Sequence, residues 1–361
     1  MITMKNNIRL LIADDSKVMR DAITKMFPHG SNIQVVAEAK NGLEAIEATA
    51  LYKPDVITMD VSMPGMDGLT ALKHIMVKTP TPTIMLSSLT LEGSHVAFDS
   101  LRFGAVDFIS KPSVLHNTDL SRQETEIRSK IEYAKSVELN SIKYIKKTLV
   151  GLSNIPEFDV KLPSRVVCIG SSEGGYAALL KIIPYLNVNV PFSYLVTMYA
   201  TRESVDAFAF YLNQFSSVHV KRAEHDELLK PGVCYLNSGM DYMTVHKPFD
   251  NYLLHVSPTP FASRKGAIDM LLFSNADVSG EKSIAVILSG SGSDGAEGLE
   301  EVIRMGGIAI TQNQDTALYK MMPTTAHDCS VGSIYVADKD IASTINNIHL
   351  KGDSSISQLI E

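Results

Sequence analysis

Five polar residues stand where short apolar segments end, and their types suit phosphoryl chemistry. They are Asp14, Asp15, Asp60, Ser87 and Lys111. Three carboxylates packed together repel one another unless a cation joins them, and oxygen ligands suit Mg²⁺. A lysine and a hydroxyl can bind phosphoryl oxygens, and an aspartate can take the phosphoryl group as an acyl phosphate. These residues therefore predict a metal-assisted phosphoryl acceptor site.

The apolar segments before these residues are typical of buried parallel strands, because they are apolar on both faces. The segments are residues 8–13, 33–37, 55–59, 83–86 and 107–109. The first helical stripe, from Val18 to Phe27, follows a candidate N-cap at Ser16. This βα alternation predicts a doubly wound sheet, in which residues at the carboxyl ends of the strands meet at one edge.

Three stretches resemble the receiver-domain signatures of response regulators: residues 11–16, 59–68 and 108–112. The resemblance covers about residues 8–112 and implies that Asp60 accepts a phosphoryl group from a sensor histidine kinase. It also implies a cis peptide bond between Lys111 and Pro112. The implied Mg²⁺ ligands are Asp14, Asp15 and Asp60. The implied switch residues are Ser87, Phe108 and Lys111.

A serine in a glycine-rich turn is a candidate nucleophile. Ser172 lies within residues 169–175, where a predicted strand turns into a helix. Glycines allow a sharp turn, and backbone N–H groups at a helix start can bind an oxyanion. A second glycine-rich stretch, residues 288–298, carries Asp294 as its acid. Taken alone, each stretch is more simply explained as an ordinary tight turn.

The order of these motifs resembles the chemotaxis methylesterase family (CheB-type), which joins a receiver to a catalytic domain. Further matching stretches are residues 230–235, 268–273, 312–313 and 322–323. The similarity covers about residues 165–330. In that family a serine–histidine–aspartate triad removes methyl esters from receptor glutamates and can deamidate receptor glutamines. Motif position implies that Ser172 is the serine and Asp294 the aspartate, whereas Tyr199 occupies the histidine position.

Other departures from the family cluster around the same site. Glu173 replaces the usual threonine beside the serine, Ser291 replaces a methionine, and Tyr242 replaces another common histidine. Imidazole accepts a serine proton near neutral pH, whereas a phenol with an ordinary pKa of about 10 stays protonated. Loss of a triad base costs on the order of 10⁴–10⁶ in turnover. We expect five histidines outside the motifs to be surface or core residues: His219, His225, His246, His255 and His327.

Length and composition suit two α/β domains, since the 361 residues are 45% hydrophobic and 20% charged. We predict two doubly wound parallel-sheet domains, a flavodoxin-like receiver and a Rossmann-like methylesterase-type domain, joined by a helical linker. The predicted boundaries are 1–115 for the receiver, 116–163 for the linker, 164–350 for the methylesterase-type domain and 351–361 for a frayed tail.

Charge and cysteine content limit the partners and the compartment. The formal net charge of −7 argues against nucleic acid as a partner, because phosphate binding needs a basic face. The apolar run at residues 8–13 is too short to span a membrane. The three cysteines have no metal-type spacing, and Cys168 is expected in the core. We therefore expect a cytoplasmic protein with protein partners and no membrane insertion.

Two functions remain open at this stage. In the first, phosphorylation of Asp60 controls a hydrolase-type domain that has lost its base and acts by binding a chemoreceptor or another signalling protein. In the second, the domain is an active protein-glutamate methylesterase and glutamine deamidase that uses Ser172 and Asp294 on chemoreceptors. In both, Ser87 and Phe108 would relay phosphorylation to a docking face. We favour the first, because the histidine loss coincides with changes at neighbouring positions.

Overall fold

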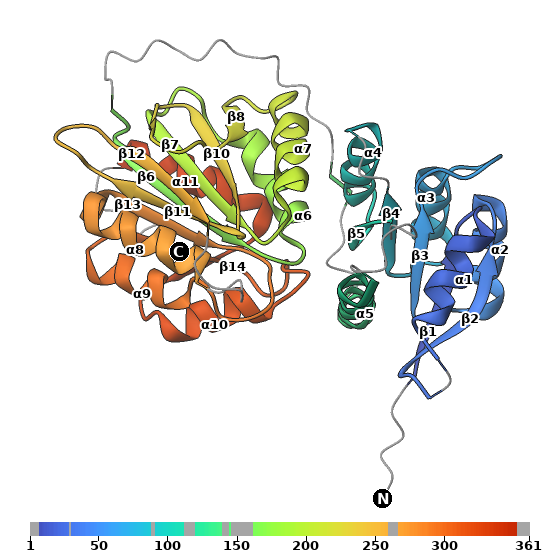
Figure 1. Ribbon diagram of the computed structural model, residues 1–361. Helices are drawn as coiled ribbons and strands as arrows, with labels where there is room; N and C mark the ends of the chain where they lie inside the picture. Colours follow the sequence, from blue (N-terminus) through green and yellow to red (C-terminus); the bar gives the residue numbers. More distant parts are fainter. Residues whose placement is uncertain are drawn as a thin grey trace, which may run out of the picture. The chain divides into compact units, whose positions relative to one another are not determined.

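The chain divides into two compact units, Met1–Ile145 and Lys146–Glu361, and each is described by itself (Figure 1). The computed structural model describes residues 7–28, 30–87, 91–111, 120–138, 144–145, 162–258 and 266–351. The Lys111–Pro112 bond, most of the predicted linker and residues 352–361 of the predicted tail lie outside these ranges.

The first unit contains a five-stranded parallel sheet with the order β2-β1-β3-β4-β5. The strands are β1 Ile8–Ala13, β2 Ile33–Ala39, β3 Val56–Asp60, β4 Thr83–Ser87 and β5 Asp107–Ser110. The helices are α1 Lys17–Lys25, α2 Gly42–Tyr52, α3 Gly68–Lys78, α4 Leu91–Arg102 and α5 Leu120–Ser136. The predicted doubly wound sheet is confirmed, and every strand ends within two residues of its predicted range.

Helix α5 lies within the range predicted for the helical linker. It packs on β3, β4 and β5 of the first unit. Its apolar stripe is buried there, with Ile127 1%, Ile131 0% and Ala134 0% exposed. The predicted linker range therefore begins with a helix that covers the receiver sheet, because burying this stripe against the sheet removes its apolar surface from water.

The second unit contains a seven-stranded parallel sheet with the order β15-β14-β13-β6-β7-β10-β8. Its strands are β6 Arg165–Ser171, β7 Phe192–Met198, β8 His219–Arg222, β10 Val233–Ser238, β13 Ser283–Ile287, β14 Ile308–Gln312 and β15 Ile334–Val336. Its α-helices are α6 Gly175–Ile182, α7 Arg202–Asn213, α8 Ala267–Ser279, α9 Ala296–Arg304, α10 Met321–Cys329 and α11 Asp338–Lys351. Two short 3₁₀ turns follow α6 and α8, at Ile183–Tyr185 and Gly280–Lys282. The predicted α/β class is confirmed for this domain too.

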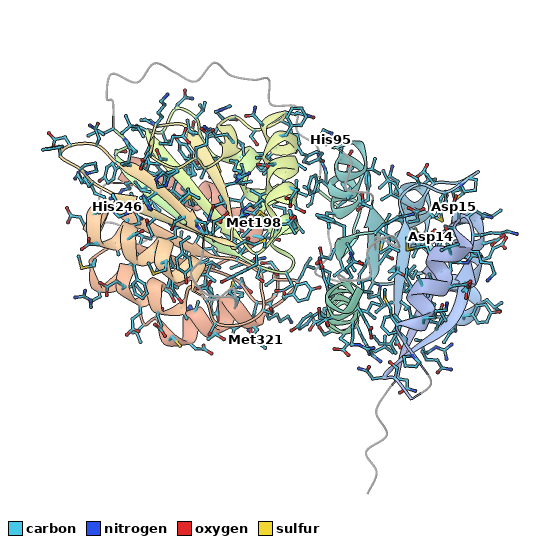
Figure 2. All side chains as sticks on the ribbon, viewed as in Figure 1. Asp14, Asp15, His95, Met198, His246 and Met321 are labelled. Carbon is cyan, nitrogen blue, oxygen red and sulfur yellow. The ribbon has the colours of Figure 1, made fainter. Side chains whose placement is uncertain are left out.

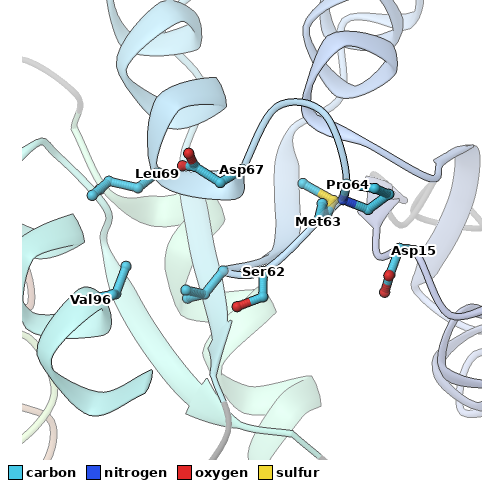
Figure 3. A pocket seen from close by; sticks show the side chains of 8 residues that line it. Asp15, Ser62, Met63, Pro64, Asp67, Leu69 and Val96 are labelled. Atoms are coloured by element: carbon cyan, nitrogen blue, oxygen red, sulfur yellow. The ribbon is translucent and has the colours of Figure 1, made fainter. Parts of the chain in front are cut away.

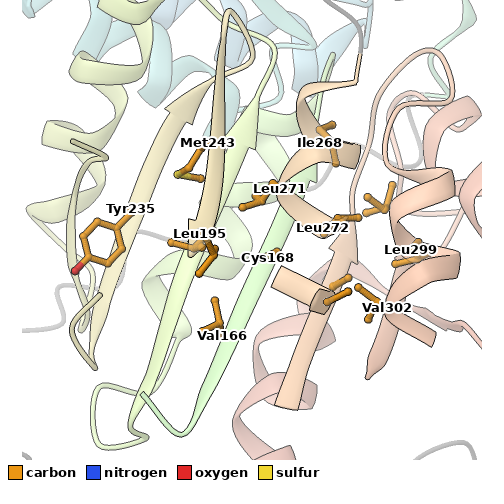
Figure 4. Packing of buried hydrophobic residues seen from close by; sticks show 14 of the residues in the cluster. Val166, Cys168, Leu195, Tyr235, Met243, Ile268, Leu271, Leu272, Leu299 and Val302 are labelled. Atoms are coloured by element: carbon orange, nitrogen blue, oxygen red, sulfur yellow. The ribbon is translucent and has the colours of Figure 1, made fainter. Parts of the chain in front are cut away.

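A small antiparallel sheet, which the sequence did not lead us to expect, joins the second unit. Its order is β11-β12-β9, with bounds β11 Asp241–His246, β12 Leu253–Pro258 and β9 Glu227–Leu228. Helix α8 packs between this sheet and the main sheet, against both β11 and β6. Figure 4 shows part of the resulting core, including Cys168, Met243 and Leu271. Cys168 is fully buried, as predicted.

Among the helices of the described residues, none combines the length and the apolar character needed to cross a membrane.

Candidate functional site

The five residues predicted to share one edge of the first sheet follow neighbouring strands. Asp60 and Ser87 end β3 and β4, while Asp14, Asp15 and Lys111 directly follow β1 and β5. Because β1, β3, β4 and β5 are parallel neighbours, their carboxyl ends lie side by side. Carboxylate oxygens of Asp14, Asp15 and Asp60 lie within 4.8 Å of one another, so these three side chains could hold a metal ion.

Lys111 forms an ion pair with two of these carboxylates. Its Nζ lies 2.8 Å from Asp60 Oδ2 and 3.1 Å from Asp14 Oδ2. Burial raises the pKa of Asp60, and Lys111 opposes that shift. Burial would lower the pKa of Lys111, but Asp60 and Asp14 outweigh it and raise that pKa. Three carboxylates and one ammonium leave two negative charges, so the residues present fit a divalent cation.

Backbone N–H groups hold two of the three carboxylates in place. The Ser16 N–H donates to Asp14 Oδ1 at 2.8 Å, and the Ser62 N–H donates to Asp60 Oδ1 at 3.1 Å. A pocket of about 570 Å³ opens beside the cluster, with Asp15 on one wall and Leu69 on another (Figure 3). The other lining residues are Val61, Ser62, Met63, Pro64, Asp67 and Val96. A small phosphodonor has room to approach here.

The remaining predicted switch residues adjoin the cluster. Ser87 is 3% exposed, and its carbonyl accepts a hydrogen bond of 2.8 Å from the Lys111 N–H. The Phe108 ring, in β5, packs edge-to-face on Phe98 of α4 with 5.3 Å between centroids. Lys130 of α5 donates to the Phe108 carbonyl at 2.8 Å and pairs with Asp107 at 3.0 Å. No motif or spacing in the sequence predicted this contact of Lys130.

In the second unit, the candidate serine and tyrosine follow neighbouring strands. Ser172 comes directly after β6 and Tyr199 directly after β7, while Asp294 lies in the loop between β13 and α9. The Ser172 N–H donates to the Ser289 carbonyl at 3.1 Å. A Cβ on Gly290 would stand 2.8 Å from Ser172 Cβ, so this loop approaches the serine closely. The strand order therefore brings all three predicted residues to one edge of the sheet.

The hydroxyl of Ser172 bonds to its neighbour in the sequence. Ser172 Oγ donates to Glu173 Oε2 at 2.5 Å. The same oxygen accepts from Ser291 Oγ at 2.7 Å and from the Ser291 N–H at 3.1 Å. Burial would raise the pKa of Glu173, but the hydrogen bonds from Ser172 and Ser291 outweigh burial and lower it. An ionised carboxylate therefore lies against the candidate nucleophile.

The hydroxyl of Tyr199 bonds to the candidate acid instead. Tyr199 donates a hydrogen bond to Asp294 Oδ2. Burial raises the pKa of the Tyr199 phenol, and the nearby Asp294 charge raises it further. Within the described residues, Ser172–Glu173 and Tyr199–Asp294 are two separate pairs with no hydrogen bond between them. The line of contacts that a triad needs is therefore interrupted between the serine and the tyrosine.

Asp294 also caps a helix. Its two carboxylate oxygens accept from the N–H groups of Ile268 and Asp269, each at 3.0 Å, in the first turn of α8. Asp269 in turn accepts from the Gly298 N–H, in the first turn of α9, at 2.7 Å. Asp294 thus satisfies free N–H groups at the start of α8, and Asp269 satisfies one at the start of α9. Burial and the neighbouring Asp294 charge raise the pKa of Asp269 to about 7.

Sequence reasoning assigned no role to Asp269, although an acid in a first helical turn is a recognisable capping signal. We also expected five histidines to lie outside the site. His225, His246 and His255 belong to the antiparallel sheet or its turn, and His219 begins β8. His327 stacks on Tyr335 with 3.6 Å between centroids. In the described part of the chain, none of the five bonds to Ser172.

Comparison with known proteins agrees with this arrangement. A family model described as CheB methylesterase matches residues 167–345, and one described as response regulator receiver domain matches residues 10–120. A protein-glutamate methylesterase/protein-glutamine glutaminase of Archaeoglobus fulgidus is 38% identical over 321 residues, covering 88% of this chain and 91% of that protein. A protein of the same name from Halalkalibacterium halodurans is 32% identical over 356 residues, covering 98% and 99%.

Among solved structures, the Thermotoga maritima CheB methylesterase catalytic domain is similar at 27% identity and a TM-score of 0.48. It covers 51% of this chain and 98% of its own length.

The two units and their sites define a response regulator that carries a methylesterase-type domain. The chain belongs to the CheB-type protein-glutamate methylesterase/protein-glutamine glutaminase family, as its resemblance to that family predicted.

Proposed function

We propose that Asp60 accepts a phosphoryl group from a sensor histidine kinase and thereby controls the second domain. Asp14, Asp15 and Asp60 would hold Mg²⁺, which supplies positive charge for the oxygens of the incoming group. Lys111 adds a second cation at 2.8 Å from Asp60 Oδ2. Ser87 and Phe108, which adjoin Lys111 and α4, are the proposed relay to a docking face.

We further propose that the methylesterase-type domain is catalytically impaired and acts through protein binding. The observation that carries this proposal is the hydrogen bond from Ser172 Oγ to Glu173, in a site where Tyr199 holds Asp294. A general base must bond to the serine hydroxyl and accept its proton near neutral pH. A phenol with a raised pKa that bonds elsewhere does neither.

Glu173 also opposes formation of the oxyanion in acyl transfer. An attacking serine creates an oxyanion, which preorganised N–H donors must stabilise. The Ser291 N–H is a nearby donor, but it already bonds to Glu173. A negative carboxylate at this position repels the developing oxyanion, because like charges within a few Å interact strongly in a partly buried site. Removing one oxyanion donor typically costs about 10²–10³-fold in turnover.

The alternative is an active methylesterase and glutaminase, and two observations favour it. The Archaeoglobus fulgidus and Halalkalibacterium halodurans relatives carry that name. In addition, Glu173 is a carboxylate in direct contact with the nucleophile, and a carboxylate can serve as a general base. The lowered pKa of Glu173 weakens this reading, since a more acidic group takes a serine proton less readily.

For partners, we propose a chemoreceptor or another signalling protein, and for location the cytoplasm. The support is the receiver domain, which requires a phosphodonor kinase, and the acidic composition, with a formal net charge of −7. Buried, unpaired Cys168 and Cys234 fit a reducing compartment.

The test is methanol release from methylated receptor by the purified full chain, before and after treatment with acetyl phosphate and Mg²⁺. We expect no release above that of Ser172→Ala under either condition. We expect phosphorylation to strengthen receptor binding equally in the wild type and in Ser172→Ala. Methanol release that disappears in Ser172→Ala would establish the enzyme and contradict impairment.

A further inference from the structure

Three histidines and one aspartate gather on the antiparallel sheet of the second unit, apart from the sites described above. His225 and Asp226 form the turn before β9, His255 lies in β12, and His246 ends β11. The turn is fixed to β12, because the Asp226 N–H donates to the Leu254 carbonyl at 2.9 Å. Figure 2 labels His246 on this unit, well separated from Met198 at the carboxyl end of β7.

The side chains of this cluster face one another. His225 Nε2 lies 3.4 Å from Asp226 Oδ2, and His255 Nδ1 lies 3.9 Å from Asp226 Oδ1. The rings of His225 and His255 have centroids 4.2 Å apart. One ligand atom from each of the three residues lies within 4.8 Å of the other two. The ligands of one tetrahedral ion lie roughly 3.3–3.5 Å apart at metal–ligand distances of about 2.0–2.1 Å, so small side-chain rotations suffice.

The hydrogen bonding of His225 prepares it as a ligand. Its Nδ1 lies 2.8 Å from the Val256 carbonyl oxygen, which can only accept, so Nδ1 carries the proton. The Val256 N–H lies farther from the same nitrogen, at 3.3 Å, and we assign the proton from the shorter contact. The lone pair is then on Nε2, the nitrogen that faces Asp226. Metal-binding histidines commonly donate their other N–H to a backbone carbonyl in this manner.

The backbone of Asp226 supports the same interpretation. Its φ of +57° lies in the left-handed region, which is uncommon for residues other than glycine. This conformation directs the carboxylate between His225 and His255. Strained backbone conformations concentrate at functional sites, where the surrounding structure maintains them.

We propose that His225, Asp226 and His255 bind one divalent transition-metal ion, of the Zn²⁺, Ni²⁺ or Co²⁺ type. Two imidazoles and one carboxylate suit such ions, whereas Mg²⁺ prefers oxygen ligands alone. The ligand side chains are 45–64% exposed, so water completes the coordination. His246 adjoins the set, 5.6 Å from the His255 ring, with its Nε2 engaged by Thr244. The ion would clamp the turn before β9 to β12.

The experiment uses untagged full chain in excess Mg²⁺, which keeps the carboxylates of the receiver occupied. Co²⁺ is titrated by calorimetry and by its visible absorption, which reports nitrogen ligation. We expect one Co²⁺ per chain under these conditions. His225→Ala, His255→Ala and Asp226→Asn should each weaken this binding by on the order of tenfold or more. Asp226→Asn is the sharpest variant, because asparagine tolerates the left-handed conformation while losing the charge.

The matched control is His74→Ala, which removes an exposed histidine from α3 in the other unit and should leave Co²⁺ binding unchanged. His225 and Asp226 are exposed and His255 is half-buried, so the variants should fold, and circular dichroism in EDTA checks this. Absence of Co²⁺ binding by the wild type would overturn the proposal. Equal binding by the wild type and the three variants would overturn it as well.

Discussion

The hydroxyl of Tyr199 donates a hydrogen bond to the carboxylate of Asp294, which lies 95 residues further along the chain. Asp294, the acid of the proposed triad, is therefore engaged, and its two oxygens also cap α8. The serine, however, donates to Glu173. Within the described residues, no hydrogen bond therefore joins the Ser172–Glu173 pair to the Tyr199–Asp294 pair, whereas a working triad needs a continuous line of contacts from serine to acid.

We predict that acetyl phosphate labels the chain on Asp60 and that labelling needs Mg²⁺. An acyl phosphate forms only if an ionised carboxylate attacks a phosphoryl group whose charge is neutralised. The adduct should be stable in acid and labile in base, and EDTA should abolish it. Asp60→Asn should remove the label, whereas Asp21→Asn, at a half-buried position of α1, should retain it. Undiminished labelling of Asp60→Asn would show that another residue is the acceptor.

We predict that Asp269 makes the second unit less stable as the pH rises. Its folded-state pKa is raised from an ordinary 3.8 to about 7, chiefly by burial. Protonated Asp269 therefore stabilises the fold; this contribution is complete below about pH 3.8 and is lost as the pH rises through about 7. Asp269→Asn imitates the protonated form and should raise the free energy of unfolding at pH 8 by roughly 1–3 kcal/mol.

Urea unfolding of the wild type and Asp269→Asn at pH 5 and pH 8 measures this effect. The difference between the two proteins should be small at pH 5, where the wild-type acid is mostly protonated. Asp277→Asn, at an exposed position of the same helix, is the control and should show no such pH dependence. If Asp269→Asn were equally destabilising at both pH values, its hydrogen bonds rather than its proton would govern stability.

We predict that the ring of Tyr199 can occupy its position only because Gly239 has no side chain. A Cβ at Gly239 would stand 2.7 Å from Tyr199 Cδ1, closer than carbon atoms can approach. Gly239→Ala should therefore displace the ring and lower the free energy of unfolding by about 1–3 kcal/mol. In a Tyr199→Ala background the same change should cost little, since the obstacle is gone. A double-mutant cycle in urea measures the coupling, and additive costs would show that Gly239 acts independently of Tyr199.

The sequence predicted the receiver sheet well because its strands are continuous apolar runs ended by polar residues. Asp60, for example, ends β3 within one residue of the predicted boundary. The packing of α5 was harder to predict. An amphipathic stripe such as that of Ile127 and Ile131 indicates a buried face but does not identify the surface that buries it. The periodicity of the sequence also did not predict the β11-β12-β9 sheet. Its two-residue strand β9 is too short to produce a pattern.

At the second site, the sequence identified the residues but not their pairing. Tyr199 was identified because it occupies the position of the histidine in the family motif. The contact between Glu173 and Ser291 joins residues 118 positions apart, and only the folded loops bring them together. The His225–Asp226 pair was visible as neighbouring residues, but the third member, His255, depends on the register of β12. Long-range pairing of this kind leaves no local signal.

We predict that Tyr199→His partly restores acyl transfer and that Glu173→Thr adds to the effect. An imidazole at position 199 could donate to Asp294, which already accepts from the phenol, and could reach the serine hydroxyl. Glu173→Thr would release the Ser172 hydroxyl and the Ser291 N–H from the carboxylate. A positioned base typically contributes about 10²–10⁴-fold. We expect the single changes to fall short of this range and the double variant to reach it, because residues that act as a unit are not additive.

The measurement is hydrolysis of an activated ester and of methylated receptor by the wild type, the two single variants and the double variant. Each is compared with its own Ser172→Ala version, so that only serine-dependent turnover is counted. If Tyr199→His abolished activity instead of creating it, the phenol itself would be the working base. If no variant gained activity, the site would have diverged beyond Tyr199 and Glu173. Ser291→Met would then be the next substitution to test, because serine in place of methionine alters the wall beside the nucleophile. The Ser291 hydroxyl and N–H both bond to Glu173.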